Sequence, residues 1–336
     1  MTYVGSKVKA CEKVGYESTL IKLPDETTED ELLNQVEELN KNDSIDGYIV
    51  QLPLPSHIDT QTILMAVDPD KDVDGFHPTN FGKMSLNLPT FISATPSGII
   101  ELLKRYKVQT EGKNTVVLGR SDIVGKPISI LMGLKTNPGN STVTLAHSRT
   151  SNIKNLTLEA DIIISALGIP NFLKEDMLKK GVVVVDVGIT RVPDNSEKGY
   201  KIVGDVDYEN VSKKCSYITP VPGGVGPMTI AMLLKNNLKA FRNKHSWYSL
   251  FYFAKIWLKS LKDLNSKAFP EGSLKNIVAC SPGLPSNLIY GSIIKFISFF
   301  LICLENFWNV FHSKTTPKCG IGTVSYTHLR AHETPV

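Results

Sequence analysis

Apolar and polar positions alternate along the first 244 residues in a rhythm that predicts strands followed by helices. Predicted strands lie at 48–52, 115–118, 142–146, 161–165 and 182–187, with a short candidate at 18–23. Most of them are rich in Ile, Val and Leu, as is typical of buried parallel strands. Helical patterns occur at 4–14, 27–39, 96–106, from 127 onward and at 228–242. A strand–helix rhythm of this kind predicts an α/β fold, with a mostly parallel sheet covered by helices.

Helix-terminal residues support these boundaries. Gly15 stops the first predicted helix, and Thr27 and Thr28 followed by two acids open the second with a capping pattern. Pro96 lies in the first turn of the helix at 96–106, where proline is tolerated.

Composition divides the chain near residue 244. The formal charge is +4 overall, but residues 245–336 hold nine Lys/Arg and four Asp/Glu, so the first 244 residues are close to neutral and give no reason to expect nucleic-acid binding. The later part also holds all three tryptophans and runs of helix breakers such as 281–285. We expect residues 245–336 to be a non-native or disordered tail, with a genuine accessory or membrane-surface segment as the alternative.

The cysteines and apolar segments indicate a cytoplasmic protein. Five scattered cysteines without C-x-x-C spacing favour a reduced chain with no structural metal. The first residues lack the apolar core of a signal peptide. The most apolar segment, 293–304, is shorter than the ~20 residues of a membrane helix, so we expect no membrane span.

Residues 117–127, VLGRSDIVGKP, predict a nucleotide-binding turn. A strand, a turn containing Gly119 and Gly125, and a helix start together place backbone N–H groups where a pyrophosphate binds, although a purely structural turn is the simpler alternative. The next strand ends in His-Ser-Arg-Thr, without the acid that binds the ribose of NAD. Arg120 with the Ser148 hydroxyl suits a 2′-phosphate, which favours NADP over NAD, whereas Arg149 alone is equally well explained as a solvated charge.

Four polar residues before this turn are candidates for catalysis or substrate binding. Tyr3 and Lys7 share a helix face at i and i+4, an arrangement also typical of short-chain dehydrogenases, where it follows the glycine turn instead of preceding it. Gln51 closes an apolar strand, at the end where α/β sheets bind ligands. Asp74 belongs to an acidic loop, 68–74, that does not match a calcium site because its glycine comes late and no glutamate closes it.

Several motifs occur in one order over residues 2 to about 244: Tyr-x-x-x-Lys, GYIVQLPLP, DVDGFH, ATPSGII, VVLGRSDIVGKP, VVVVDVGI, VGDV and TPVPGGVGPMT. In this the chain resembles the bifunctional methylenetetrahydrofolate dehydrogenase/methenyltetrahydrofolate cyclohydrolase family of the bacterial type. The resemblance implies a folate and catalytic domain at 1–94, an NADP-binding Rossmann domain at 95–225, and a helix at 226–244 that returns to the first domain. It also implies a homodimer acting on tetrahydrofolate derivatives.

The resemblance assigns roles residue by residue. Lys7 is implied to be the cyclohydrolase catalytic residue, with Tyr3 beside it against the folate and Gln51 tuning it. Asp74 is implied to anchor the pterin, and Gly223 and Gly224 to line the substrate cleft. The implied cofactor positions are Gly119, Arg120, Ser121, Ile123, Ser148, Arg149 and Ile189. In this chemistry a hydride leaves the methylene folate for NADP, and water then opens the methenyl product to 10-formyltetrahydrofolate.

Two departures from the family pattern bear on activity. The family has a strand and a helix before its Tyr-x-x-x-Lys helix, so the first domain is expected to lack a strand and to expose unpaired sheet edges. Two alternatives follow: a dehydrogenase with impaired cyclohydrolase, or an inactive nucleotide-binding fragment. Ala94, where the family commonly has cysteine, is expected to matter little.

Overall fold

A five-stranded parallel sheet forms the centre of the larger part of the described structure. The computed structural model describes residues 3–196, 199–245 and 320–324. The sheet consists of β3 (Asn114–Leu118), β4 (Thr142–Ala146), β5 (Ile162–Ser165), β6 (Val183–Asp186) and β9 (Tyr217–Ile218), in the order β4-β3-β5-β6-β9. The chain moves from β3 to β4 on one side and then to β5 on the other side of β3. The strand order therefore reverses between β3 and β5, where ligands of open α/β sheets bind.

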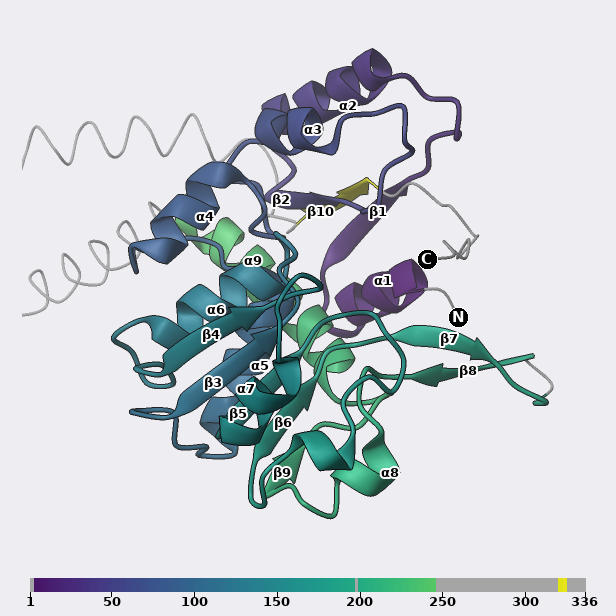
Figure 1. Ribbon diagram of the computed structural model, residues 1–336. Helices are drawn as coiled ribbons and strands as arrows, with labels where there is room; N and C mark the ends of the chain where they lie inside the picture. Colours follow the sequence, from purple (N-terminus) through teal and green to yellow (C-terminus); the bar gives the residue numbers. More distant parts are fainter. Residues whose placement is uncertain (1–2, 197–198, 246–319, 325–336) are drawn as a thin grey trace, which may run out of the picture. The chain divides into compact units, whose positions relative to one another are not determined.

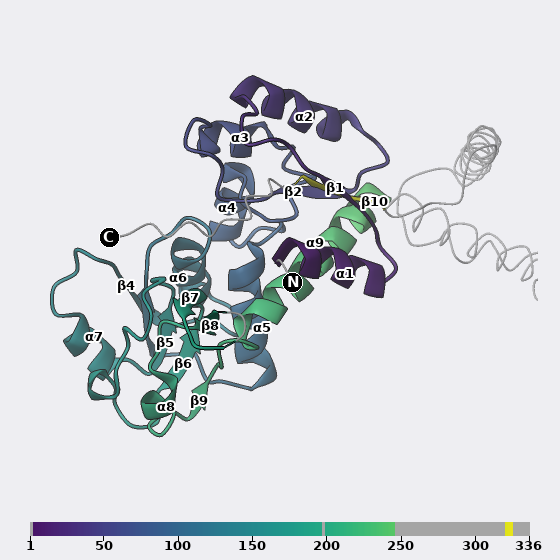
Figure 2. The same ribbon diagram turned by 90° about the vertical axis from the view of Figure 1, so that its right-hand side faces the viewer.

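Helices cover both faces of this sheet, as the alternating strand residues require (Figures 1 and 2). Val117 of β3 faces a core shared with α4 (Pro78–Ser85), α5 (Ala94–Arg105) and α6 (Gly125–Gly133). Its neighbour Val116 faces the opposite core, which includes residues beside α7 (Ile153–Glu159), η1 (Glu175–Met177) and α8 (Tyr208–Val211). An antiparallel pair, β7 (Thr190–Pro193) and β8 (Tyr200–Val203), extends from this part.

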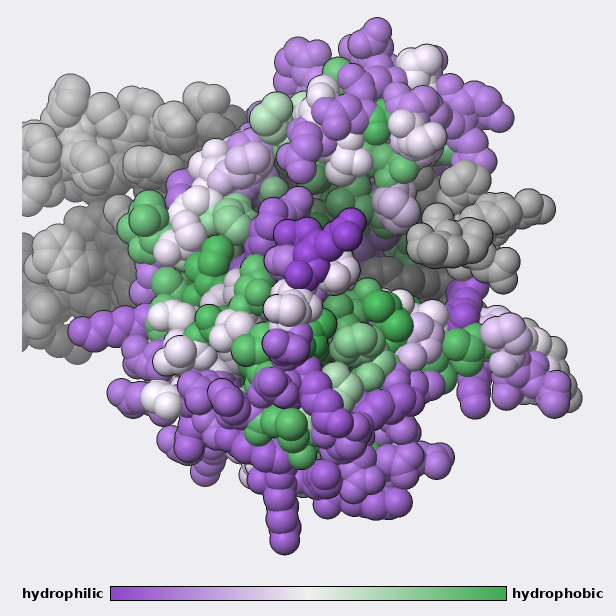
Figure 3. Space-filling model, viewed as in Figure 1, coloured by the Kyte–Doolittle hydropathy of each residue, from purple (hydrophilic) through white to green (hydrophobic). Residues whose placement is uncertain are grey.

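The first residues form a second, smaller α/β layer. Its elements are α1 (Tyr3–Lys13), β1 (Glu17–Ile21), α2 (Glu29–Lys41), β2 (Gly47–Val50) and α3 (Thr60–Ala66). Thr28 caps α2: its hydroxyl accepts from the Glu31 N–H at 3.3 Å, and the Glu31 carboxylate accepts from the Thr28 N–H at 2.8 Å, as the capping pattern predicts. The surface over α2, at the top of Figure 3, is mostly hydrophilic, because its apolar residues point inward.

Helix α9 (Val225–Lys244) returns to this layer, as the sequence predicts. Met232 and Leu233 of α9 pack with Ile49 of β2, while Tyr48 and Val50 face α2 on the other side. The Asn236 amide donates to the Val73 carbonyl at 2.8 Å. The α/β class and the returning helix are thus confirmed, whereas the exact domain boundaries stay a prediction.

The smaller sheet contains a strand from the other end of the chain. Strand β10 (Gly320–Val324) lies between β1 and β2 and pairs in parallel with both (Figure 1). The expectation of unpaired sheet edges is therefore wrong for the facing edges of β1 and β2, whereas the lack of the family's first strand and helix stays a prediction. Edge N–H and C=O groups require partners, and β10 supplies them to β1 and β2 at once. Apart from 245 and 320–324, the predicted tail lies outside the described residues.

Candidate active site

Lys7 and Gln51 meet although 44 positions separate them. The Lys7 ammonium donates to the Gln51 side-chain oxygen at 3.1 Å, and the Gln51 amide donates to the Leu52 carbonyl at 2.9 Å, which fixes the amide orientation. Lys7 is only 7% exposed on α1. Burial lowers its pKa from the ordinary lysine value, against a smaller opposing effect of Asp74. A buried amine that has a lowered pKa and is oriented by a neutral amide is suited to proton transfer.

Asp74 lies close enough to Lys7 for the two groups to influence each other's ionisation. Burial raises the pKa of the Asp74 carboxyl to about 6, the positive charge of Lys7 lowers it, and Asp72 raises it further. An acid with this pKa is charged or neutral depending on small changes in its surroundings, which is common where a carboxyl contacts a ligand.

Asp72, in contrast, is the structural anchor of the acidic loop. Its carboxylate accepts from the backbone N–H groups of Gly75, Phe76 and His77 at 2.8–3.2 Å and from the Asn80 amide at 2.8 Å. The loop thus keeps its shape through backbone hydrogen bonds. Within residues 3–196, 199–245 and 320–324, no group of three or more His, Cys, Asp or Glu side chains is placed to hold a metal ion.

Tyr3 and the glycine pair at 223–224 are the remaining candidates for folate binding. Tyr3 begins α1, but its side chain lies outside the described part of the chain, so its contact with the folate stays a prediction. Gly223 and Gly224 lie in the turn before α9. Gly223 has a φ of +106°, and a Cβ at Gly224 would lie 2.5 Å from the Pro220 carbonyl oxygen, so the turn requires both glycines.

The turn after β3 is closed by a contact between its two glycines. A Cβ added at Gly125 would lie 2.0 Å from the Gly119 carbonyl oxygen, and one at Gly119 would lie 2.2 Å from the carbonyl oxygen of Ala166, which follows β5. Gly119 also has a φ of +109°. The spacing between these glycines is thus set by a direct backbone approach within the turn and between neighbouring strands.

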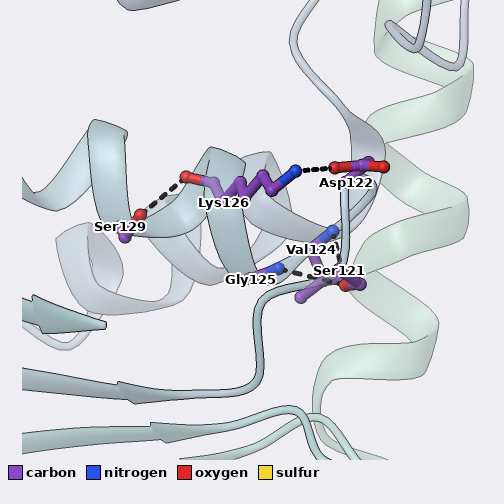
Figure 4. A network of polar contacts seen from close by, with 6 residues as sticks. All are labelled: Ser121, Asp122, Val124, Gly125, Lys126 and Ser129. Atoms are coloured by element: carbon purple, nitrogen blue, oxygen red, sulfur yellow. Dashed lines mark hydrogen bonds and ion pairs between the residues drawn. The ribbon is translucent and has the colours of Figure 1, made fainter. Parts of the chain in front are cut away.

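Ser121 and Lys126 stabilise the start of α6 (Figure 4). The Ser121 hydroxyl accepts from the N–H groups of Val124 at 3.3 Å and Gly125 at 3.2 Å. Lys126 forms an ion pair with Asp122 in the same turn. Such capping fixes the helix N-terminus, whose dipole favours an anion.

Arg120, Ser148 and Arg149 lie at the carboxyl ends of the parallel strands. Leu118 and Ala146, the last residues of β3 and β4, pair with each other, and Arg120 and Ser148 each follow two positions later at the carboxyl ends of these strands. All three side chains are exposed. Ile123 and Ile189, the two apolar cofactor candidates, are 37% and 61% exposed. Exposed isoleucines and arginines are consistent with a surface that binds a part-apolar, part-anionic ligand.

Two buried aspartates at the carboxyl ends of the strands, Asp186 and Asp205, are absent from the sequence-based candidates. Asp186 ends β6, and its carboxylate accepts from the N–H groups of Gly188, Asp205 and Val206 at 2.9–3.0 Å. Both acids lie in motifs quoted above, VVVVDVGI and VGDV. The available signal is an acid directly after an apolar strand, because such a carboxylate is buried with the strand end and needs partners.

No helix among the described residues is long and apolar enough to cross a membrane.

Two family models match the chain. The catalytic domain of tetrahydrofolate dehydrogenase/cyclohydrolase matches residues 1–74, and the NAD(P)-binding domain of the same family matches residues 93–245. Together they cover both the Lys7 site and the glycine turn.

Curated relatives and solved structures agree with this match. "Bifunctional protein FolD" of Flavobacterium psychrophilum is 71% identical over 241 residues, which are 71% of this chain and 82% of the relative. The FolD structure of Campylobacter jejuni has a TM-score of 0.68 at 51% identity, covering 72% of this chain and 83% of that one. The Trypanosoma brucei enzyme, complexed with NADP and an inhibitor, has the same TM-score at 39% identity, covering 72% and 82%.

Proposed function

This chain belongs to the tetrahydrofolate dehydrogenase/cyclohydrolase family, and on that basis we propose that it uses NADP and hydrolyses its product through Lys7. It is a bifunctional enzyme that oxidises 5,10-methylenetetrahydrofolate with a nicotinamide dinucleotide and converts the methenyl product to 10-formyltetrahydrofolate. The observation that supports the Lys7 assignment best is its hydrogen bond to Gln51 in a buried site.

In the hydrolytic step water adds to the methenyl carbon, and a proton must leave that water. Lys7 is the group suited to accept or relay it, because burial lowers the pKa of its ammonium. Gln51 holds the amine in place without adding a negative charge, which would favour the protonated form. Asp74, with Tyr3, Gly223 and Gly224, is assigned to binding the folate.

In the oxidative step the bound dinucleotide supplies the hydride acceptor, and the protein supplies binding and orientation. The close approach of Gly125 to the Gly119 carbonyl makes a tight turn directly before the N-terminus of α6, where backbone N–H groups suit a pyrophosphate. Arg120, with Ser148 and Arg149 also at the carboxyl ends of the strands, is assigned to the 2′-phosphate of NADP, because a guanidinium pairs with phosphate in a fork. Ser121, Ile123 and Ile189 are assigned to the rest of the cofactor surface.

The proposal further includes a cytoplasmic homodimer without nucleic-acid or membrane partners. The near-neutral charge of the first 244 residues supports the exclusion of nucleic acid. Sedimentation of the purified chain tests the dimer.

Two assays on one preparation test the function. Reduction of NADP with methylenetetrahydrofolate reports the dehydrogenase, and decay of added methenyltetrahydrofolate without nucleotide reports the hydrolase. Lys7→Ala should slow the hydrolysis at least about a hundredfold, as expected for loss of a proton-transfer group. Lys9→Ala, an exposed lysine on the same helix, is the matched control and should leave both rates unchanged. Unchanged hydrolysis in Lys7→Ala would remove the role of Lys7.

Cofactor choice has its own test. Arg120→Ala should raise the KM for NADP about tenfold or more while changing that for NAD much less, since only NADP carries the 2′-phosphate. Lys104→Ala, which removes an exposed charge of the same sign from α5, is the control. An equal effect of Arg120→Ala on both nucleotides would reject the 2′-phosphate assignment.

A further inference from the structure

Asp205 ties the turn after β5 to the segment after β8. Its side chain is completely buried. One carboxylate oxygen accepts from the backbone N–H groups of Leu167 at 2.6 Å and Gly168 at 3.2 Å, and from the Ser165 hydroxyl at 3.3 Å. Hydrogen bonds to a buried carboxylate are strong, so this single oxygen fixes the path of the chain where β5 ends.

The second oxygen of Asp205 lies against the turn after β6. It is buried and has no hydrogen-bond partner within the described residues. A Cβ at Gly188 would lie 2.2 Å from it, so the oxygen faces the Gly188 backbone. Asp186 joins the same turn from the other side, accepting from the N–H groups of Gly188 and Asp205. The two aspartates therefore hold the turns after β5 and β6 in one arrangement.

These turns border the glycine turn proposed to bind the dinucleotide. The Ala166 carbonyl, directly before the two N–H groups held by Asp205, is the group that a Cβ at Gly119 would strike at 2.2 Å. Ala166 also donates its N–H to the Leu118 carbonyl at the end of β3, at 2.8 Å. A shift of the turn after β5 would therefore move against Gly119, at the point where the strand order reverses.

We propose that Asp205 is a positioning residue for the dinucleotide: by holding the N–H groups of Leu167 and Gly168 it keeps the turn after β5 shaped as a wall of the cofactor site. The inference rests on the proposed function. Loss of this role should reduce the dehydrogenase activity and spare the hydrolase activity, because hydrolysis of the methenyl compound needs no nucleotide. Small misplacements of groups that orient a reactant cost much of the rate, whereas an activity that does not use those groups is spared.

The test compares Asp205→Ala, Asp205→Asn and wild type in both assays. Asp205→Ala should raise the KM for NADP at least about tenfold, with methenyl hydrolysis without nucleotide within about twofold of wild type. Asp205→Asn keeps one acceptor oxygen for Leu167 and Gly168, so its KM for NADP should lie between those of wild type and Asp205→Ala. Asp161→Asn is the control: this acid also accepts a backbone N–H beside β5, from Asn114 at 2.9 Å, but at the amino end of the strand. It should leave the KM for NADP unchanged.

An unchanged KM in Asp205→Ala, or a parallel loss of both activities, overturns the inference. Should Asp205→Ala fail to fold, Asp205→Asn decides: a KM for NADP raised about threefold with intact hydrolysis supports the role, and an unchanged KM rejects it. Failure of the proposed function has a different signature, because wild type itself would then neither reduce NADP nor hydrolyse the methenyl compound.

Discussion

At the scale of single residues, the buried pair of Lys7 and Gln51 should set the pH at which hydrolysis proceeds. In Gln51→Glu a carboxylate would stand about 3 Å from the Lys7 ammonium and stabilise its charge, so the pKa of Lys7 should rise. The pH at which the hydrolysis rate increases should then move upward by about one unit. Rates of methenyl decay measured across a pH series check this shift.

Gln35→Glu is the control for this change, because Gln35 lies on α2, where its amide donates to the nearby Glu38 carboxylate. It adds the same charge away from Lys7 and should leave the profile in place. A profile that moves to lower pH in Gln51→Glu, or does not move, would contradict the role given to Gln51.

The raised pKa of Asp74 predicts that the unfolding free energy depends on pH. Its folded pKa of about 6 lies above the ordinary value of 3.8, so the folded state binds the proton more tightly than the unfolded state. The associated stability is present below about pH 4 and is lost as pH rises through 6. Asp74→Asn, which stays neutral, should therefore match wild type at pH 4 and be more stable by about 2–3 kcal/mol at pH 8. Urea unfolding at the two pH values measures the difference, and an equal difference at both would contradict it.

Sequence reasoning identifies site residues where residue type itself carries the chemistry. A helix face indicates Lys7 and a strand end indicates Gln51, and the structure joins the two side chains, while their roles stay a proposal. The anchoring contacts of Asp72 and Asp205 are not predictable in this way, because most of their partners are backbone N–H groups. Any sequence supplies such groups, so only the folded path of the chain selects them.

At the scale of elements, the turn before α6 depends on the approach of Gly125 to Gly119. Gly125→Ala places a methyl group 2.0 Å from a backbone oxygen, and the turn must shift to accept it. We expect a loss of about 1–3 kcal/mol in unfolding free energy and a larger loss of dehydrogenase than of hydrolase activity. Gly133→Ala, at the other end of the same helix, is the control. Its Cβ would meet its nearest neighbour at 3.9 Å, and it should keep both activities.

The sequence predicts most strands of the larger sheet closely. The strand expected at 142–146 has those bounds, because Thr alternates with apolar residues in this half-buried edge strand. The strands expected at 115–118, 161–165 and 182–187 agree within two residues, because buried parallel strands are rich in apolar residues. The two-residue β9 and the short helices α3, α4 and α7 are missed. With seven or eight residues each, these helices span only about two turns and provide too few positions to establish a period of 3.6.

At the scale of the whole molecule, the smaller sheet depends on residues 320–324. Both neighbours of β10 pair with it, so its backbone N–H groups lie within a central strand. Thr323→Pro removes one of these donors and leaves a carbonyl of a neighbouring strand unpaired, which should cost about 1–3 kcal/mol of unfolding free energy, measured by urea unfolding. Hydrolysis through Lys7 should fall with it, since β1 and β2 adjoin the helix and the strand end that carry the site.

Thr323→Val is the control for this change. It keeps the backbone N–H and a β-branched side chain suited to a strand, so it should leave the unfolding free energy close to that of wild type. Equal stabilities of Thr323→Pro and Thr323→Val would show that β1 and β2 do not need this strand.

The pairing of β10 could not be predicted from the sequence. Gly320 meets Glu17 across about 300 positions, and a run of five residues with two glycines carries no signal for so distant a partner. The apolar runs of β1 and β2 indicate strands, but they do not say which segment lies between them.

The place of β10 has a consequence for how the protein is made. The ribosome delivers β1 and β2 early and the strand between them about 270 residues later. At a synthesis rate of about 5–20 residues per second, the nascent chain carries two unpaired strand edges for roughly 15–55 s. During that time the edges can pair with other chains. The central strand of the sheet is thus the last to be synthesised.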